Sequence, residues 1–324
     1  MPISGPSSYL PTIEQFVAHW TLANATLGVG NEIVLVPGIV VGDLVARGED
    51  LKQLRDGVTD KTLDRALARE ALNGQLGLMQ TRLVEFNDRV RADLPQSTFV
   101  RVLPLAFQVG DAENIVREAL RQMRGLWIKV NAYAPVPPGL ILPYTLRDGY
   151  ALAQFEGDME SLRLAYRALT EADLALRLAR EERNDLQDVI YEVLKKYRLK
   201  LPTAVPINSA LADSLPALTP APGHTPEAVA AQAAWVAAQL QAKITWTGSK
   251  DADLAHYEVR GVPGDSYHSD DETVLATIMP DAAREFFTDF ALSQPGITAG
   301  FKVYVVLNSG NERGSNPVYL TRPV

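Results

Sequence analysis

The chain has 324 residues, of which 47% are hydrophobic and 22% are charged, and its formal net charge is −8. These proportions are ordinary for globular proteins, and the acidic balance argues against a surface that tracks the phosphates of a nucleic acid. The sequence contains no cysteine, which excludes thiol catalysis, iron–sulfur ligation and disulfide bonds.

The N-terminal segment 1–6 lacks the basic flank and apolar core of a secretory signal. The most apolar early run, Ile33–Val41, has nine residues and contains Pro37 and Gly38. A membrane-spanning helix needs about 20 apolar residues. We therefore expect a soluble protein without membrane insertion, either cytoplasmic or exported by a route that uses no cleaved signal.

Two long stretches without proline lie between Pro37 and Pro95 and between Pro143 and Pro202. Their apolar residues recur at steps of three and four, which predicts a long helix in each, of about 50 residues or ~75 Å. Because such helices need partners to bury their apolar faces, we expect them to pack together. The clearest apolar stripe consists of Leu76, Met79, Leu83, Phe86 and Val90.

A shorter helix is predicted before each long one. The first covers Thr12–Leu27, with Thr12 as a possible N-cap, and the second covers Asp111–Val130. The proline-rich links Tyr133–Pro143 and Pro202–Pro226 are predicted to contain no helix.

The two long stretches resemble each other when one is shifted by 111 positions. They then align without a gap from Gly38 and Gly149 to Pro95 and Pro206, with 12 identities in 58 positions. The matched Gly and Pro at both ends favour an internal duplication over chance. The prediction is an antiparallel helical bundle over residues 1–215, built from repeats at about 12–104 and 111–215. The best-matched segment pairs Leu67-Ala68-Arg69-Glu70 with Leu178-Ala179-Arg180-Glu181.

After a proline-rich linker at 216–225, the apolar period changes to two. Short alternating runs separated by Gly, Pro, Asn and Asp turns predict an antiparallel β-sandwich over 226–324. Segment 228–240 is rich in alanine and fits a helix or a strand equally well. The predicted strands lie at 243–247, 257–260, 273–278, 285–290, 301–307 and 318–321.

This C-terminal part resembles the fibronectin type III family. The resemblance rests on Trp246, on Tyr257-x-Val259, on Leu292 before a turn, on Phe301-x-Val303-x-Val305-x-Leu307 and on the segment 311–316 before a last strand. It implies a β-sandwich that acts as a spacer or binding module, and it implies a first strand within 228–240. One position departs from the family, because Phe301 stands where the family has the tyrosine of its corner hydrogen bond.

An acidic loop is the one candidate metal site. Its oxygen ligands for calcium would come from Asp265, Asp270, Asp271 and Glu272, with Asp251 and Asp253 in another loop. The spacing is not that of an EF-hand, and acidic turns are common in such domains. We therefore prefer the interpretation that the loop is a solvated acidic turn without a metal, and we expect no cofactor.

Other catalytic signatures are absent from the sequence. Gly28-Val29-Gly30 follows a helix and lacks the further glycine of a dinucleotide fingerprint. His19 and His224 are interpreted as packing or surface residues. Neither long helix contains histidine, which excludes the Glu-x-x-His ligand set of a di-iron bundle.

Three hypotheses about function follow. The first is a non-enzymatic structural or protein-interaction protein that self-associates or binds a protein through its helices, as a phage or injection-machine component would. The alternative is an accessory protein that binds a carbohydrate or another surface, for which an exposed aromatic platform would be needed. An enzyme with a site between its domains ranks third. The aromatic residues available for a platform are Trp235, Tyr267 and Tyr304.

Overall fold

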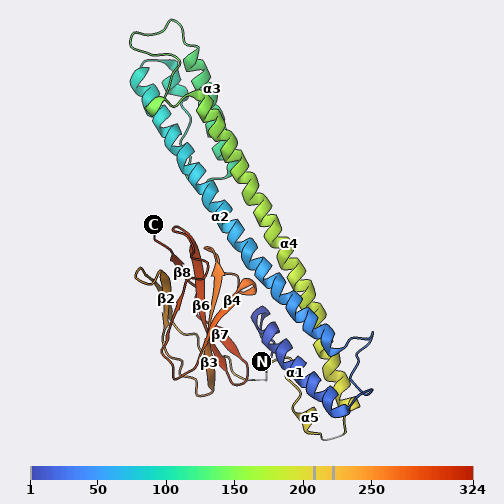
Figure 1. The fold of residues 1–324 in the computed structure, drawn as a ribbon. Coiled ribbons are helices and arrows are strands. Elements are labelled where there is room, and N and C mark those ends of the chain that lie inside the picture. Colours follow the sequence, from blue (N-terminus) through green and yellow to red (C-terminus); the bar gives the residue numbers. More distant parts are fainter. Residues whose placement is uncertain (1, 207–208, 221–222, 324) are drawn as a thin grey trace. The chain divides into compact units, whose positions relative to one another are not determined.

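The computed structural model describes residues 2–206, 209–220 and 223–323 of the chain (Figure 1). The chain forms two compact units: unit 1 consists of Met1–Ala66 and Ala175–Val324, and unit 2 of Leu67–Leu174. The helices are η1 (Pro6–Ser8), α1 (Tyr9–Leu27), α2 (Val41–Asp93), η2 (Thr98–Val102), α3 (Glu113–Asn131), η3 (Arg147–Gly149), α4 (Leu152–Ala204), α5 (Ala210–Asp213) and η4 (Ser269–Asp271). The strands are β1 (Ala231–Val236), β2 (Gln241–Trp246), β3 (Leu254–Pro263), β4 (Thr273–Ile278), β5 (Glu285–Thr288), β6 (Thr298–Leu307), β7 (Glu312–Gly314) and β8 (Val318–Thr321).

The two long helices are present as predicted, and each contributes residues to both units. In unit 1, α1 lies beside the first part of α2 and the last part of α4, and the core between them contains Phe16, Leu51 and Leu194 (Figure 1). In unit 2, α3 packs on the remaining parts of the same two helices, around Met123 and Leu83. The predicted bundle thus differs from the structure in one respect: α1 and α3 do not share a core, because each short helix covers a different part of the long pair.

The helix boundaries correct three expectations. Helix α1 begins at Tyr9, so Thr12 is not its N-cap, and the Thr12 hydroxyl donates instead to the carbonyl of Ser8 within the helix (2.7 Å). Pro11 is tolerated because amides in the first turn have no helical partner to lose. The link Pro202–Pro226 does contain helix, namely the end of α4 and the short α5. Residues 207–208 and 221–222 of that link lie outside the described residues.

The two short-helix and long-helix pairs share several structural details. Helices α2 and α4 each have 53 residues and begin 111 positions apart, and α1 and α3 each have 19 residues. Gly38 and Gly149, which precede the long helices, both adopt the left-handed backbone, with φ of 99° and 75°. The long helices and the two glycines fall on the offset of 111 that the sequence alignment uses, whereas the short helices begin 104 positions apart.

A tryptophan makes the same contact in both pairs. The indole Nε1 of Trp20 donates to the carbonyl of Ile33 (3.1 Å), and that of Trp127 donates to the carbonyl of Tyr144 (2.8 Å). Each acceptor residue lies in the loop before the long helix and has its own amide bonded to an asparagine side chain of the short helix. The two asparagines are Asn24 and Asn131.

The β domain consists of two antiparallel sheets. One has the strand order β1-β2-β5 and the other β4-β3-β6-β7, with β8 also paired to β6. Apolar side chains of both sheets meet in one core, which includes Ile244 of β2, Val259 of β3 and Val303 of β6. The predicted strands are present, and the alanine-rich segment forms β1, a strand. Phe301 is fully buried in this core.

The predicted domain boundary at 216–225 lies within unit 1, and the division of the chain into domains at that linker stays a prediction. No helix in the described parts of the chain combines the length and apolar character that crossing a membrane requires.

Candidate functional site

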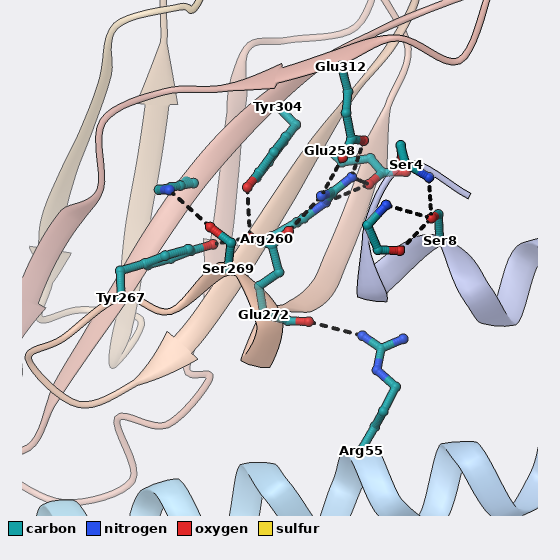
Figure 2. A network of polar contacts seen from close by, with 12 residues as sticks. Ser4, Ser8, Arg55, Glu258, Arg260, Tyr267, Ser269, Glu272, Tyr304 and Glu312 are labelled. Atoms are coloured by element: carbon teal, nitrogen blue, oxygen red, sulfur yellow. Dashed lines mark hydrogen bonds and ion pairs between the residues drawn. The ribbon is translucent and has the colours of Figure 1, made fainter. Parts of the chain in front are cut away.

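A cluster of buried charged side chains lies in the β domain around Arg260 of β3 (Figure 2). The Arg260 side chain is 1% exposed and contacts three carboxylates. Its Nε donates to Glu258 Oε2 (2.8 Å), one terminal nitrogen to Glu272 Oε1 (2.6 Å) and the other to Glu312 Oε2 (2.5 Å). Charge-assisted bonds of this kind are among the strongest in proteins, and here they use the whole donor fork of the guanidinium.

The strand geometry explains why these groups meet. Glu258 and Arg260 are two residues apart on β3 and therefore point to the same face of the sheet. Tyr304 on β6 is the direct cross-strand partner of Glu258, and its ring lies 3.8 Å from the guanidinium carbon of Arg260. Glu312 reaches the same arginine from β7, which pairs with β6.

Two tyrosines complete the hydrogen bonding of the Glu272 carboxylate. The hydroxyls of Tyr267 and Tyr304 both donate to Glu272 Oε2, at 3.0 Å and 2.9 Å. Since the other oxygen binds Arg260, both oxygens of this carboxylate have partners. Burial raises the pKa of both tyrosines, and the neighbouring Glu272 charge raises it further.

Burial and charge act on the acids in different ways. Burial alone would raise the pKa of Glu258, but bonds from His256 and the charge of Arg260 outweigh it and lower that pKa below its ordinary value. At Glu272 burial dominates and raises the pKa despite Arg260. Burial disfavours the charged form of Arg260 and by itself would lower its pKa. Glu312 and the other two acids outweigh burial and raise the pKa of Arg260.

Three arginines from the long helices hold the loop that contains η4, and all of them belong to unit 1. Arg183 on α4 donates to Asp271 Oδ1 (2.9 Å) and to the carbonyl of Asp270 (2.6 Å). Arg180 on α4 binds the second oxygen of Asp271. Arg55 on α2 donates to the carbonyl of Glu272 (3.0 Å). The side chains of Arg183 and Asp271 are 2% and 1% exposed, so this is a buried ion pair.

The four predicted calcium ligands are not brought to one point in the described structure. Asp265 and Asp270 are exposed, whereas Asp271 and Glu272 are buried and bonded to different arginines. Those arginines supply the positive charge that a calcium ion would supply. The preferred interpretation, an acidic turn without a metal, and its alternative, calcium binding by this loop, both stay untested.

The structure does bring together a group that the sequence did not suggest as a unit. His224 Nε2 lies 3.0 Å from Asp251 Oδ1 and 3.7 Å from Asp253 Oδ1. Among the described residues, these three side chains form the group that could hold a metal ion. Their potential ligand atoms all lie within 4.8 Å of one another. The hydrogen bond from His224 lowers the pKa of Asp251. The imidazole is 59% exposed, and a solvated histidine–aspartate pair accounts for the contact.

The Arg260 cluster was missed by sequence reasoning. Its only sequence signal is the placement of Glu258 and Arg260 inside a strand, where charged residues are buried only when they are paired. The acids at 272 and 312 come from distant parts of the chain, and nothing in the pattern assigns them to this arginine.

The candidate aromatic platform does not form from the three predicted residues. Tyr304 is 8% exposed and, like Tyr267, is bonded to Glu272. Trp235 lies on β1 in the other sheet, with the guanidinium of Arg322 5.5 Å from its ring.

Comparisons with known proteins give likenesses for the β part of the chain only. No protein-family model matches, and no curated protein matches. Among solved structures, pectate lyase PelI from Erwinia chrysanthemi is similar at 18% identity and a TM-score of 0.24, over 29% of this chain and 28% of that one. Pectate lyase Pel3 from Pectobacterium carotovorum is similar at 12% identity and a TM-score of 0.24, over 29% and 27%. An Fn3-like protein from Clostridium thermocellum is similar at 21% identity and a TM-score of 0.23, over 32% of this chain and 95% of that one. This chain therefore spans less than a third of each pectate lyase.

Proposed function

We propose that this chain is a non-enzymatic structural protein that associates with further copies of itself through its helical region. In this proposal the β domain is a fibronectin type III-type sandwich carried by the helices as a spacer or binding module. The helical region is a duplication of one short-helix and long-helix unit. The equal helix lengths and the matched tryptophan contacts support that duplication.

The charged clusters support a structural role. Arg260 is bonded to three carboxylates, and Arg183 to Asp271, so these buried charges have partners within the chain. Breaking such a pair leaves an uncompensated buried charge, so the pairs hold a defined geometry.

The observation that carries the proposal is a stripe on the part of α4 that belongs to unit 1, where exposed apolar residues alternate with exposed charged ones. Its three apolar members are about half exposed or more (49–69%), although most apolar residues of the long helices that face a neighbour are buried. At 100° per residue they fall within an arc of about 80° on the helix surface, together with the charged residues Asp185, Glu192 and Lys196. A second copy of the same stripe is the simplest cover, because most oligomers are built from identical chains. The apolar members are Leu178, Val189 and Leu199.

Sedimentation velocity over a range of concentrations tests this proposal. We expect the full chain to form a concentration-dependent oligomer, and we expect Leu178→Glu to shift it toward the monomer, because a carboxylate in the stripe must be desolvated on association. Leu22→Glu is the matched control, since Leu22 is a 58% exposed leucine on α1 outside the stripe. A chain that remains monomeric at every concentration contradicts self-association, and so does an equal shift in both variants.

A further inference from the structure

A groove of about 680 Å³ lies between α3 and α4 in unit 2. Its floor includes the nearly buried Leu120 and Leu162 and the partly buried ring of Tyr166. Its rims carry arginines and glutamates in equal number, so the groove favours neither a polyanion nor a polycation. The pairs that these residues form are Arg117–Glu113, Arg121–Glu118, Arg124–Glu156 and Arg163–Glu160.

A cleft of about 450 Å³ in unit 1, beside the Arg260 cluster, is built from the matching helical residues. The match uses the offset of 111 for the long helices and, for the short helices, the separation of 107 between Trp20 and Trp127. Eight helical residues line the cleft, and six of them, all except Ser8 and Asp56, correspond to residues that line the groove. The six pairs are Ser7 with Asn114, Leu10 with Arg117, Pro11 with Glu118, Glu14 with Arg121, Lys52 with Arg163 and Arg55 with Tyr166.

The cleft and the groove differ in their opposite wall. In unit 1 the wall consists of strands β3 and β4, with Glu258 and Val274 among its residues. In unit 2 the described residues that line the groove all belong to α3 or α4. The same face of the repeated helical pair is therefore covered by a β-sheet in one unit and lined by helices alone in the other. The cleft that remains under the sheet in unit 1 shows that a sheet covers this face without filling it.

The β domain has a second sheet with a free outer face. In β2, Ala242 and Ile244 point into the core, so the alternate residues Lys243 and Thr245 point outward. Lys243 is paired with Glu285 (2.7 Å), so the charge of this face is balanced like that of the groove. The cross-strand partners form two outward rows, Gln232 with Thr245 and Glu285, and Ala234 with Lys243 and Phe287.

A second copy of the chain fits the groove best. Each chain has two matching helical faces and one β domain, and strands β3 and β4 of that domain already lie on the face formed by α1 and α2. A β domain on the face formed by α3 and α4 therefore comes from another molecule. The β1-β2-β5 face offers the ring of Phe287 to the apolar floor, and Lys243 and Glu285 offer opposite charges to the rims.

We infer that the groove between α3 and α4 binds the outer face of the β1-β2-β5 sheet of a second copy. The inference rests on the proposed self-association and adds to it two surfaces that meet. Since the groove and the sheet face are different surfaces of the chain, the contact is heterologous, and it repeats from copy to copy into a ring or a filament.

Crosslinking of single-cysteine variants tests the inference, because the native chain has no cysteine. Asn114→Cys places a thiol in the groove and Gln232→Cys places one on the sheet face, and both residues are exposed, so neither change should disturb folding. The two full-length variants are mixed with a short bismaleimide at a concentration where sedimentation velocity shows the oligomer. We expect a covalent dimer that joins positions 114 and 232, identified by mass spectrometry.

Asp88→Cys is the matched control, since Asp88 is a 68% exposed residue of unit 2 that lies on α2 outside the groove. Mixed with Gln232→Cys, it should give roughly tenfold less product, because only a docked contact raises the effective concentration of the two thiols. Equal yields from positions 88 and 114 overturn the inference, and so does a product that joins position 114 to itself in place of position 232.

The same experiment separates this inference from the proposed function. A chain that sediments as a monomer at every concentration overturns both. In an oligomer that Leu178→Glu dissociates, failure to form the product between positions 114 and 232 overturns the inference alone.

Discussion

The α1 side and the α3 side of the helical region share several features, and in unit 1 the β domain is attached to the α1 side by arginines of α2 and α4. Both short helices have 19 residues, and both place a tryptophan against a backbone carbonyl before the following long helix. Their apolar cores also correspond, since Tyr197 contacts Trp20 and the residue 111 positions earlier, Phe86, contacts Trp127. The apolar framework is therefore common to the two sides.

Two of the three arginines that hold the loop with η4 have no counterpart on the α3 side. With the same offset, Arg55 corresponds to Tyr166 and Arg183 corresponds to Leu72, whereas Arg180 corresponds to Arg69. Leu72 is buried in the core of unit 2, whereas Arg183 binds Asp271 in unit 1. On this comparison, the residues that distinguish the α1 side are Arg55 and Arg183, which contact the β domain from a similar apolar framework.

The largest effect is expected for Arg183→Leu, which places in unit 1 the leucine that unit 2 has at the corresponding position, Leu72. The change leaves the buried carboxylate of Asp271 with Arg180 as its one remaining arginine, and losing one partner of a buried pair costs about 3 kcal/mol or more. Urea unfolding followed by tryptophan fluorescence measures the loss.

Arg177→Leu is the control for that variant. Arg177 lies on the same helix, is 68% exposed and is 3.8 Å from Glu181. Surface pairs of this kind contribute little, so the control should unfold like the native chain. Equal losses in the two variants would show that the attachment does not depend on the buried pair.

The second prediction tests whether the two sides are equivalent. Trp20→Phe and Trp127→Phe each remove a donor from a buried carbonyl, and each should destabilise the chain by about 1–3 kcal/mol. Trp235→Phe is the control, because Trp235 is half-buried and its substitution removes no hydrogen bond found in the structure. Equilibrium unfolding that shows a loss at one tryptophan and none at the other would break the correspondence.

The smallest effect is a dependence of stability on pH. It comes from Glu258, a residue of the β domain that has no counterpart on the α3 side. The pKa of Glu258 is lowered in the folded chain, below the 4.5 of an ordinary glutamate. Its contribution to stability is therefore fully present above about pH 4.5 and is lost as the pH falls through the lowered pKa. Glu258→Gln should cost about 1–2 kcal/mol at neutral pH, with a difference from the native chain that shrinks on acidification.

Unfolding midpoints measured between pH 2 and pH 7 check this prediction. Glu14→Gln, which removes the carboxylate of an exposed glutamate on α1, is the control. A difference for Glu258→Gln that does not shrink on acidification would mean that Arg260 and His256 do not stabilise the charged form of this acid.

The elements were largely predictable from the sequence, and the site was not. The three- and four-residue steps of Leu76, Met79 and Leu83 predict a helix because each turn must present an apolar face. Where α1 begins was not predictable, because Pro11 fits inside a first turn as well as before one. The alternation of apolar and polar residues around Trp246 predicts a strand, because a strand in a half-buried sheet must also present an apolar face. The pairing of Arg183 with Asp271 joins residues 88 positions apart, and no local pattern records such a pair.

A double-mutant cycle tests most directly the claim that the β domain is attached to one of two matching helical sides by a buried ion pair. The free energy of unfolding is measured for the native chain, Arg183→Leu, Asp271→Asn and the double variant. The account predicts a coupling energy of at least about 2 kcal/mol, because neutralising Asp271 removes the buried charge that Arg183→Leu leaves with Arg180 alone. Additive effects, with a coupling below about 0.5 kcal/mol, would contradict the claim.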